Sequence, residues 1–119
     1  MRILIVDDSR AMRMIVTRTL RQAGFNGHDI VEATNGQEAL NAIETDNPDL
    51  VLSDWNMPEM TGIELLTRLR TSGCEVPFGF VTSETSPAMR ERAATAGAMF
   101  LIAKPFSADD FETALASVL

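Results

Sequence analysis

Short apolar runs alternate with segments of helical periodicity along the whole 119-residue chain. The runs have the length of buried strands, whereas the segments between them repeat apolar residues every three or four positions. This alternation predicts an α/β fold in which helices cover both faces of a parallel sheet. The strands are expected at residues 3–7, 29–33, 49–53, 77–81 and 99–103.

Five helices are expected to follow the strands, and start signals mark each of them. The later four begin at Asn35 or Gly36, at a capping box formed by Thr61 and Glu64, at Ser86 with Pro87, and at Ser107. The first helix has the clearest apolar stripe, which ends before Gly24 and consists of Met12, Ile15, Val16, Thr19, Leu20 and Ala23. The residues expected to be buried in the others are Ala39, Leu40 and Ile43, then Ile63, Leu66 and Leu69, and finally Phe111, Leu115 and Val118.

The order of the strands can be inferred from the connections between them. Right-handed crossovers with helices on both faces favour a doubly wound, flavodoxin-like, five-stranded sheet of order 2-1-3-4-5. In such sheets ligands bind beyond the carboxyl ends of the strands, at the point where the order reverses. Asp7 and Asp8 follow the first strand and Asp54 follows the third. The topology therefore predicts a crevice where three carboxylates gather.

Polar residues also end the fourth and fifth strands, at Thr82 and Lys104. Each of these residues taken alone has an ordinary explanation. Asp7, Asp8 and Ser9 suit the start of a helix, Thr82 suits a strand, and lysines are commonly solvated at the surface. Their convergence at one edge of the sheet favours a functional site over these separate explanations.

Three gathered carboxylates require a cation, because each pair repels by roughly 4 kcal/mol at 4 Å in a medium of effective dielectric about 20. The sequence has one cysteine and one histidine, Cys74 and His28, which excludes an internal disulfide and a Cys/His metal site. Mg²⁺ fits, since it prefers oxygen ligands and often combines carboxylates with phosphate oxygens. Asp54 could then act as a nucleophile toward an activated phosphoryl group, with Mg²⁺ and Lys104 screening the charge.

Charge and hydropathy narrow the classes of partner. The net charge of −7 disfavours binding to nucleic acids, whose backbones reward clustered lysine and arginine. The apolar runs are far shorter than the roughly 20 residues of a membrane helix, and Met1 is followed directly by a strand rather than a signal peptide. We expect one domain over residues 1–119, a cytoplasmic location, no membrane insertion and no nucleic-acid partner, so that the partners are proteins.

Four segments of the chain resemble the response-regulator receiver domain of two-component signalling, and the resemblance extends over essentially the whole sequence. They read ILIVDDS at 3–9, DWNMP at 54–58, VTS at 81–83 and KPF at 104–106. The second segment, together with Glu84, is similar to the stand-alone regulators of chemotaxis. The resemblance implies a single-domain response regulator that catalyses its own phosphorylation and dephosphorylation and is not a metabolic enzyme.

The resemblance also implies a role for each site residue. It implies that Asp54 is the phosphoacceptor and that Asp7 and Asp8 are acidic partners of Mg²⁺, with Asp8 a direct ligand. The backbone carbonyl of Asn56 is implied to be a further ligand of the ion. Thr82 and Lys104 correspond to the phosphoryl-sensing pair, and Asn56 and Glu84 to the residues that tune hydrolysis. In that family a histidine kinase or a histidine phosphotransfer protein donates the phosphoryl group. A downstream target protein binds at the fourth helix, fifth strand and fifth helix.

One position departs from the pattern of the family. Its rotating aromatic residue on the fifth strand corresponds to Leu101 here, with Phe100 beside it. Neighbouring side chains on a strand point to opposite faces, so Phe100 is not expected to replace the missing aromatic ring. We therefore expect phosphorylation to be intact and the switch between Thr82 and Leu101 to be different or weaker.

Three other functions compete with this one. The main alternative is a non-phosphorylated adaptor that keeps the receiver fold and binds its partners constitutively. An enzyme acting on phosphorylated metabolites is disfavoured, because no second domain or large loop is available to close over a substrate. A flavodoxin-like electron carrier is disfavoured too, since Asp7 and Asp8 would repel a flavin phosphate.

Overall fold

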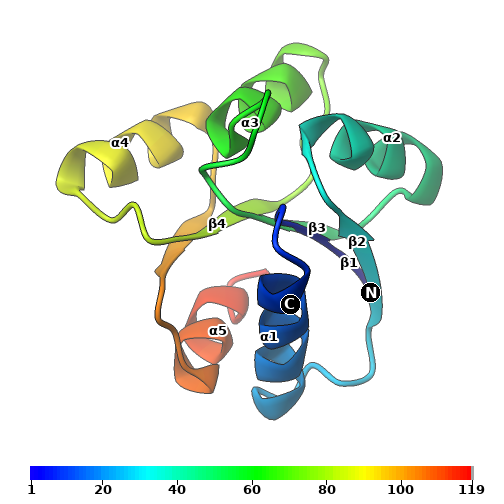
Figure 1. Ribbon diagram of the computed structural model, residues 1–119, viewed down its shortest axis with the longest axis vertical. Coiled ribbons are helices and arrows are strands. Elements are labelled where there is room, and N and C mark those ends of the chain that lie inside the picture. Colours follow the sequence, from blue (N-terminus) through cyan, green and yellow to red (C-terminus); the bar gives the residue numbers. More distant parts are fainter. Residues whose placement is uncertain (119) are drawn as a thin grey trace.

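The structure, a computed structural model, describes residues 1–118, in which five strands alternate with five helices (Figure 1). The strands are β1 (Arg2–Val6), β2 (Asp29–Ala33), β3 (Leu50–Ser53), β4 (Phe78–Thr82) and β5 (Phe100–Ala103). The helices are α1 (Arg10–Gln22), α2 (Gly36–Asp46), α3 (Gly62–Thr71), α4 (Pro87–Ala96) and α5 (Ala108–Leu115). Both ends of every strand lie within one residue of the expected position.

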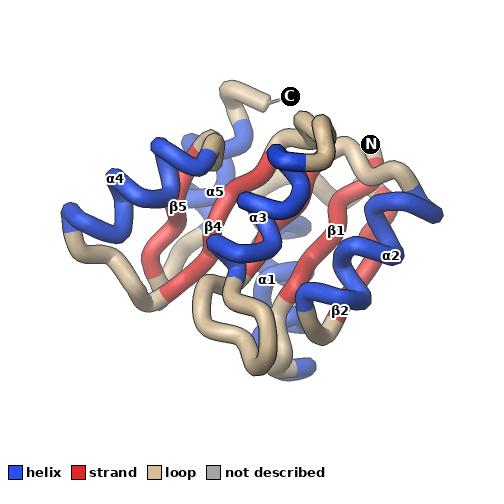
Figure 2. The backbone as a smooth tube through the Cα atoms, turned by 90° about the horizontal axis from the view of Figure 1, so that it is seen from above, coloured by secondary structure: helices blue, strands red, loops and turns tan. Residues whose placement is uncertain are grey.

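All five strands are parallel and form one sheet of order β2-β1-β3-β4-β5, which confirms the predicted topology (Figure 2). The register aligns the carboxyl ends of the strands. Val6 lies opposite both Ala33 and Ser53, and Thr82 lies opposite Ala103. The residues that follow these strands therefore emerge along one edge of the sheet, which is the predicted place of the site.

Helices cover both faces of the sheet. Helices α1 and α5 lie on one face and α2, α3 and α4 on the other (Figure 1). The interior strand β1 contributes to both cores, because Ile3 and Ile5 join the cluster under α1 and α5 whereas Leu4 and Val6 join the opposite one. This two-sided burial explains why β1, β3 and β4 are apolar along most of their length. None of the helices in residues 1–118 is both long and apolar enough to cross a membrane.

The buried face of α1 differs from the expected stripe. Val16 and Leu20 are buried as expected, but Ile15 is 41% exposed, so its expected burial is wrong. Arg13 is buried instead, with 8% exposure. The helix is rotated so that the arginine faces the end of β1, where its polar group finds partners, and Ile15 is left at the outer edge.

Two later helices also differ in detail. The carboxylate of Glu64 accepts a hydrogen bond from the Thr61 hydroxyl, which itself accepts from the Glu64 amide, so only half of the expected capping box forms. A complete capping box forms at Ser107, whose partner is Asp110. In α3 the fully buried leucines include Leu65, whereas the expected Ile63 is only partly buried, and Val118 lies beyond the end of α5.

Candidate functional site

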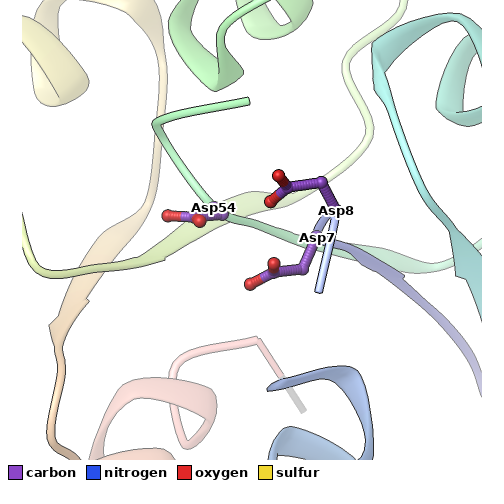
Figure 3. A group of neighbouring side chains, drawn as sticks. All are labelled: Asp7, Asp8 and Asp54. Carbon is purple, nitrogen blue, oxygen red and sulfur yellow. The ribbon is translucent and has the colours of Figure 1, made fainter. Parts of the chain in front are cut away.

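Three carboxylates meet where β1 and β3 end. One oxygen from each of Asp7, Asp8 and Asp54 lies within 4.8 Å of the others. Figure 3 shows the three side chains side by side beyond the strands that carry them. The amide of Asp54 donates to the carbonyl of Val6 at 2.9 Å, and the amide of Asp7 donates to Ala33 at 3.1 Å. Because both bonds continue the sheet past its strand ends, the backbone of the acids is fixed by the fold.

Within residues 1–118, Lys104 carries the single positive charge that forms ion pairs with these carboxylates. Its Nζ lies 3.3 Å from Oδ2 of Asp7 and 3.4 Å from Oδ2 of Asp54. The backbone amide of Lys104 donates to the carbonyl of Thr82 at 2.9 Å, which holds the start of the loop after β5 against β4. Lys104 is also the only lysine of the sequence. The ammonium group therefore bridges two of the three acids.

The electrostatics of the cluster favour a bound cation. Asp7 is 4% exposed, and this burial raises the pKa of its carboxyl group; Asp54 raises it further, while the Ser9 amide and Lys104 lower it. Three carboxylates and one ammonium leave two negative charges uncompensated when all are ionised. A divalent ion with a preference for oxygen ligands matches this charge and this donor set, so the residues fit Mg²⁺.

The carboxylate of Asp54 is held from both sides. Its Oδ1 accepts a hydrogen bond of 2.7 Å from the amide of Trp55, and its Oδ2 faces Lys104. The side chain is 13% exposed, so it remains open to a reactant. Its orientation is therefore fixed by these neighbours, as nucleophilic attack would require of a carboxylate.

Sequence reasoning missed Gly62, which packs against the backbone of Asp54. A Cβ atom at Gly62 would lie 2.2 Å from the carbonyl oxygen of Asp54, and the Gly62 amide donates to the carbonyl of Trp55 at 2.7 Å. Only glycine allows this approach of α3 to the residue after β3. A glycine directly after the cap residue Thr61, where other residues make better helices, was the available signal.

The remaining predicted residues lie at the end of β4 and on the loops beyond β3 and β4. Thr82 is fully buried, and its Oγ1 accepts a hydrogen bond of 3.1 Å from the Glu84 amide. That bond leaves the hydroxyl hydrogen of Thr82 available to another acceptor. Asn56 and Glu84 contact each other, since the side-chain amide of Asn56 donates to the Glu84 carboxylate at 3.1 Å.

Leu101 and Phe100 point to opposite faces of β5, as expected. Leu101 packs against the core under α2, α3 and α4, whereas Phe100 packs against the core under α1 and α5. The ring of Phe100 occupies the space beside Gly79, where a Cβ atom would lie 2.1 Å from it. Phe100 therefore packs on the face covered by α1 and α5, and it does not replace an aromatic residue at position 101.

Comparison with known proteins agrees with this geometry. The family model of the response regulator receiver domain matches residues 3–116. The chain belongs to this family. Two response regulators named MprA are each 36% identical to this receiver domain. The one from Mycolicibacterium vanbaalenii matches 99% of this chain and 50% of its own length, and the one from Mycobacterium avium matches 100% and 51%. The chain spans about half the length of these curated relatives.

Solved structures show the same receiver fold. The receiver domain of Francisella response regulator 1452 is similar with a TM-score of 0.87 and 28% identity, covering 98% of this chain and 94% of that one. The chemotaxis protein CheY4 of Vibrio cholerae gives a TM-score of 0.86 and 34% identity, covering 99% and 98%. The likeness confirms the fold class and includes a chemotaxis response regulator among the structural relatives.

Proposed function

We propose that this receiver domain takes a phosphoryl group onto Asp54 from a phosphohistidine of a histidine kinase or a histidine phosphotransfer protein. The observation that carries the proposal is the gathering of three carboxylate oxygens within 4.8 Å, with the Lys104 ammonium 3.4 Å from Asp54. A nucleophile, acidic metal ligands and a fixed positive charge are the parts that phosphoryl transfer to a carboxylate needs.

The transfer is a displacement at phosphorus. A carboxylate oxygen of Asp54 forms the new P–O bond while the P–N bond of the donor breaks. The electron pair of the broken bond goes to the imidazole nitrogen, which takes up a proton from solvent. Lys104 offsets negative charge on the phosphoryl oxygens, and the Trp55 amide holds the other side of the carboxylate at 2.7 Å.

Mg²⁺, when bound, would supply the charge compensation that lets two anions approach each other. Asp7, Asp8 and Asp54 would hold it, with Asp8 as a direct ligand and the backbone carbonyl of Asn56 as a further one. The support is the uncompensated charge of the cluster and its all-oxygen donor set. Asp8 is the exposed member, so it faces the solvent from which the hydrated ion arrives.

The second half of the cycle is slow hydrolysis of the aspartyl phosphate. Water attacks phosphorus and the bond between phosphorus and the Asp54 oxygen breaks, which regenerates the carboxylate and releases phosphate. Asn56 and Glu84 line the approach of water in this proposal, because Asn56 lies two residues after Asp54 and its side-chain amide donates to the Glu84 carboxylate at 3.1 Å. Their polar atoms tune the rate by holding water near the phosphoryl group.

The proposed switch runs from Thr82 to a protein-binding face. The Thr82 hydroxyl donates to a phosphoryl oxygen, and because its Oγ1 is bonded to the Glu84 amide, the loop after β4 follows its movement. A groove of about 350 Å³ lies between α4, β5 and α5, with Leu101 in its lining and Arg90 and Asp110 among its charged residues. We place the downstream target protein there, with Leu101 acting as a packing contact in place of a rotating aromatic ring.

For the receiver domain over residues 1–119 we propose a role of the chemotaxis type in the cytoplasm. The support is the structural similarity to CheY4, because the aligned region covers 98% of the CheY4 chain. Neither nucleic acid nor membrane is proposed as a partner, given the net charge of −7.

Trp55 provides the test, because it is buried next to the acceptor and packs against Phe80 with 4.7 Å between ring centroids. Mg²⁺ and then beryllofluoride are titrated while its fluorescence is recorded, and acetyl phosphate labelling is measured in parallel. We expect both ligands to change the emission of the parent protein. Asp54→Asn should lose the beryllofluoride response and the label, whereas Asp109→Asn, on the exposed surface of α5, should keep both.

Full labelling of Asp54→Asn would place the acceptor elsewhere. The alternative function, a constitutive adaptor, gives a different pattern in the same experiment. It requires that neither beryllofluoride nor acetyl phosphate alters the emission of Trp55, and that a bound target is retained equally with and without them.

A further inference from the structure

Arg13 is a buried cation that the proposed chemistry does not use. It is 8% exposed and lies on α1, facing the end of β1 rather than the solvent. An arginine is rarely buried unless its guanidinium is paired and hydrogen-bonded. The partners of Arg13 lead directly to the acidic cluster.

The first partner is the backbone between two of the acids. Nη1 of Arg13 donates a hydrogen bond of 2.7 Å to the carbonyl oxygen of Asp7. That oxygen belongs to the peptide group that joins Asp7 to Asp8, and a peptide group is planar. Fixing the oxygen therefore fixes the direction in which the chain enters Asp8. Asp8 is exposed, so its carboxylate is aimed by the backbone rather than by packing.

The second partner anchors the arginine itself. Nε of Arg13 donates to Oε1 of Glu32 at 2.8 Å, and Glu32 lies on β2 opposite Ile5 of β1. The guanidinium is a rigid fork, so one partner sets the direction in which the other donor points. Arg13 is thus connected to the cluster through hydrogen-bond geometry.

We propose that Arg13 is a positioning residue for the metal site, which holds the Asp7–Asp8 peptide so that the Asp8 carboxylate faces Asp54. The inference rests on the proposed function, because it gives Mg²⁺ affinity as the property that Arg13 supports. Groups that orient metal ligands without touching the metal commonly change metal affinity by about 10- to 100-fold when they are removed.

The first experiment measures the Mg²⁺ dissociation constant by Trp55 fluorescence and by calorimetry. Arg13→Met should bind Mg²⁺ about 10-fold more weakly or worse. Arg13→Lys keeps the charge without the fork and should also bind more weakly. Arg18→Met is the matched control, since it removes the same charge from the exposed face of α1 and should leave the affinity unchanged. Parent-like affinity in Arg13→Met, or full recovery in Arg13→Lys, would overturn the proposal.

The second experiment tests, in the absence of metal, whether Arg13 holds the backbone at Asp7 and Asp8 in place. Hydrogen exchange is followed in EDTA at the amides of Asp7 and Ser9, which donate to the Ala33 carbonyl at 3.1 Å and the Asp7 carboxylate at 2.9 Å. Arg13→Met should speed exchange at these two amides more than at the amides of β3. Equal acceleration everywhere would show that Arg13 only stabilises the fold, and would refute the inference.

These two measurements separate the inference from the proposed function. A parent protein that shows no Mg²⁺ response would defeat the metal site, while the exchange data would still decide the role of Arg13. Glu32→Gln covers the case in which Arg13→Met fails to fold, because the Glu32 side chain is 49% exposed and the core stays intact. Glu32→Gln should weaken Mg²⁺ binding less than Arg13→Lys does. An unchanged affinity would argue against the role of Glu32 in orienting Arg13.

Discussion

The side-chain amide of Asn56 donates a hydrogen bond of 3.1 Å to the carboxylate of Glu84, which joins the loop after β3 to the loop after β4. Glu84 also uses its backbone amide to bond the hydroxyl of the buried Thr82 at 3.1 Å. One residue thus contacts both the proposed water approach and the proposed switch. Changes at position 84 are therefore expected to alter how long the phosphorylated state lasts.

Glu84→Leu should slow the loss of the phosphoryl group. The substitution removes the partner of Asn56 and places an apolar group where water approaches. We expect hydrolysis to slow by about five- to tenfold, the rate equivalent of one lost hydrogen bond of about 1 to 1.4 kcal/mol. The decay of labelled protein after removal of the donor measures the rate. The control is Glu91→Leu, on the exposed side of α4, which should lose the phosphoryl group at the rate of the parent. If Glu84→Leu also lost it at that rate, Glu84 would not control the access of water to the phosphoryl group.

Lys104→Ala should weaken the metal-free fold without abolishing metal binding. It leaves Asp7 and Asp54, which lie 3.3 and 3.4 Å from the ammonium, without their shared counter-charge. We expect a loss of about 1 to 3 kcal/mol in the free energy of unfolding in EDTA, less than a fully buried pair because Lys104 is partly exposed.

Mg²⁺ should restore part of the stability lost in Lys104→Ala, since the ion supplies the missing positive charge. Urea unfolding with and without Mg²⁺ at matched ionic strength measures both effects. Arg18→Ala removes one positive charge at an exposed position of α1 and is the control. If Lys104→Ala lost all response to Mg²⁺, the lysine would have to be part of the metal site rather than its competitor.

Asp7→Asn should make the metal-free protein more stable at neutral pH. Burial raises the pKa of Asp7 in the folded state, so the folded protein keeps this proton to higher pH than the unfolded chain does. The free energy of unfolding therefore falls as the pH rises from about 4 through the raised pKa, and the penalty persists above it. Asparagine carries no such charge and still offers an oxygen to the Ser9 amide.

Unfolding in urea with EDTA, repeated between about pH 3 and pH 7, tests the direction of this effect. The parent should lose more stability over this range than Asp7→Asn. Asp109→Asn provides the same change of charge at an exposed position and should follow the parent. If the free energy of unfolding of Asp7→Asn fell with pH as steeply as that of the parent, Asp7 would be excluded as the source of the pH dependence.

Gly62→Ala should disturb the acceptor loop. Its added Cβ would lie 2.2 Å from the Asp54 carbonyl oxygen and 2.8 Å from the Phe80 ring, so α3 or the loop must move. We expect a loss of about 1 to 3 kcal/mol, as for other overpacked sites. Gly27→Ala is the control, because a methyl group at that position would have no other atom within 4 Å. Thermal unfolding compares the two, and equal melting temperatures would contradict the close approach.

Local patterns were enough to predict the sheet and the residues at its edge. Strands buried on both faces are apolar along most of their length, so polar residues in the sequence mark where they end. Asp7, Asp54 and Lys104 stand at such ends, and the parallel order of the strands brings them to one edge. The rules of strand connection supplied the order, and the charges at the edge supplied the chemistry.

The tertiary structure alone decided how the site is supported. Arg13 is one polar residue within a helix, and its burial depends on Glu32 of β2 and on the carbonyl of Asp7, neither of which a helical period reveals. Ile15 is exposed for the same reason, since the helix turns toward the partners of the arginine. The contact of Gly62 with Asp54 likewise arises when α3 returns to β3. Periodicity encodes which side of an element is apolar, whereas the direction of a long side chain and the distance between two backbones depend on elements that are distant in the sequence.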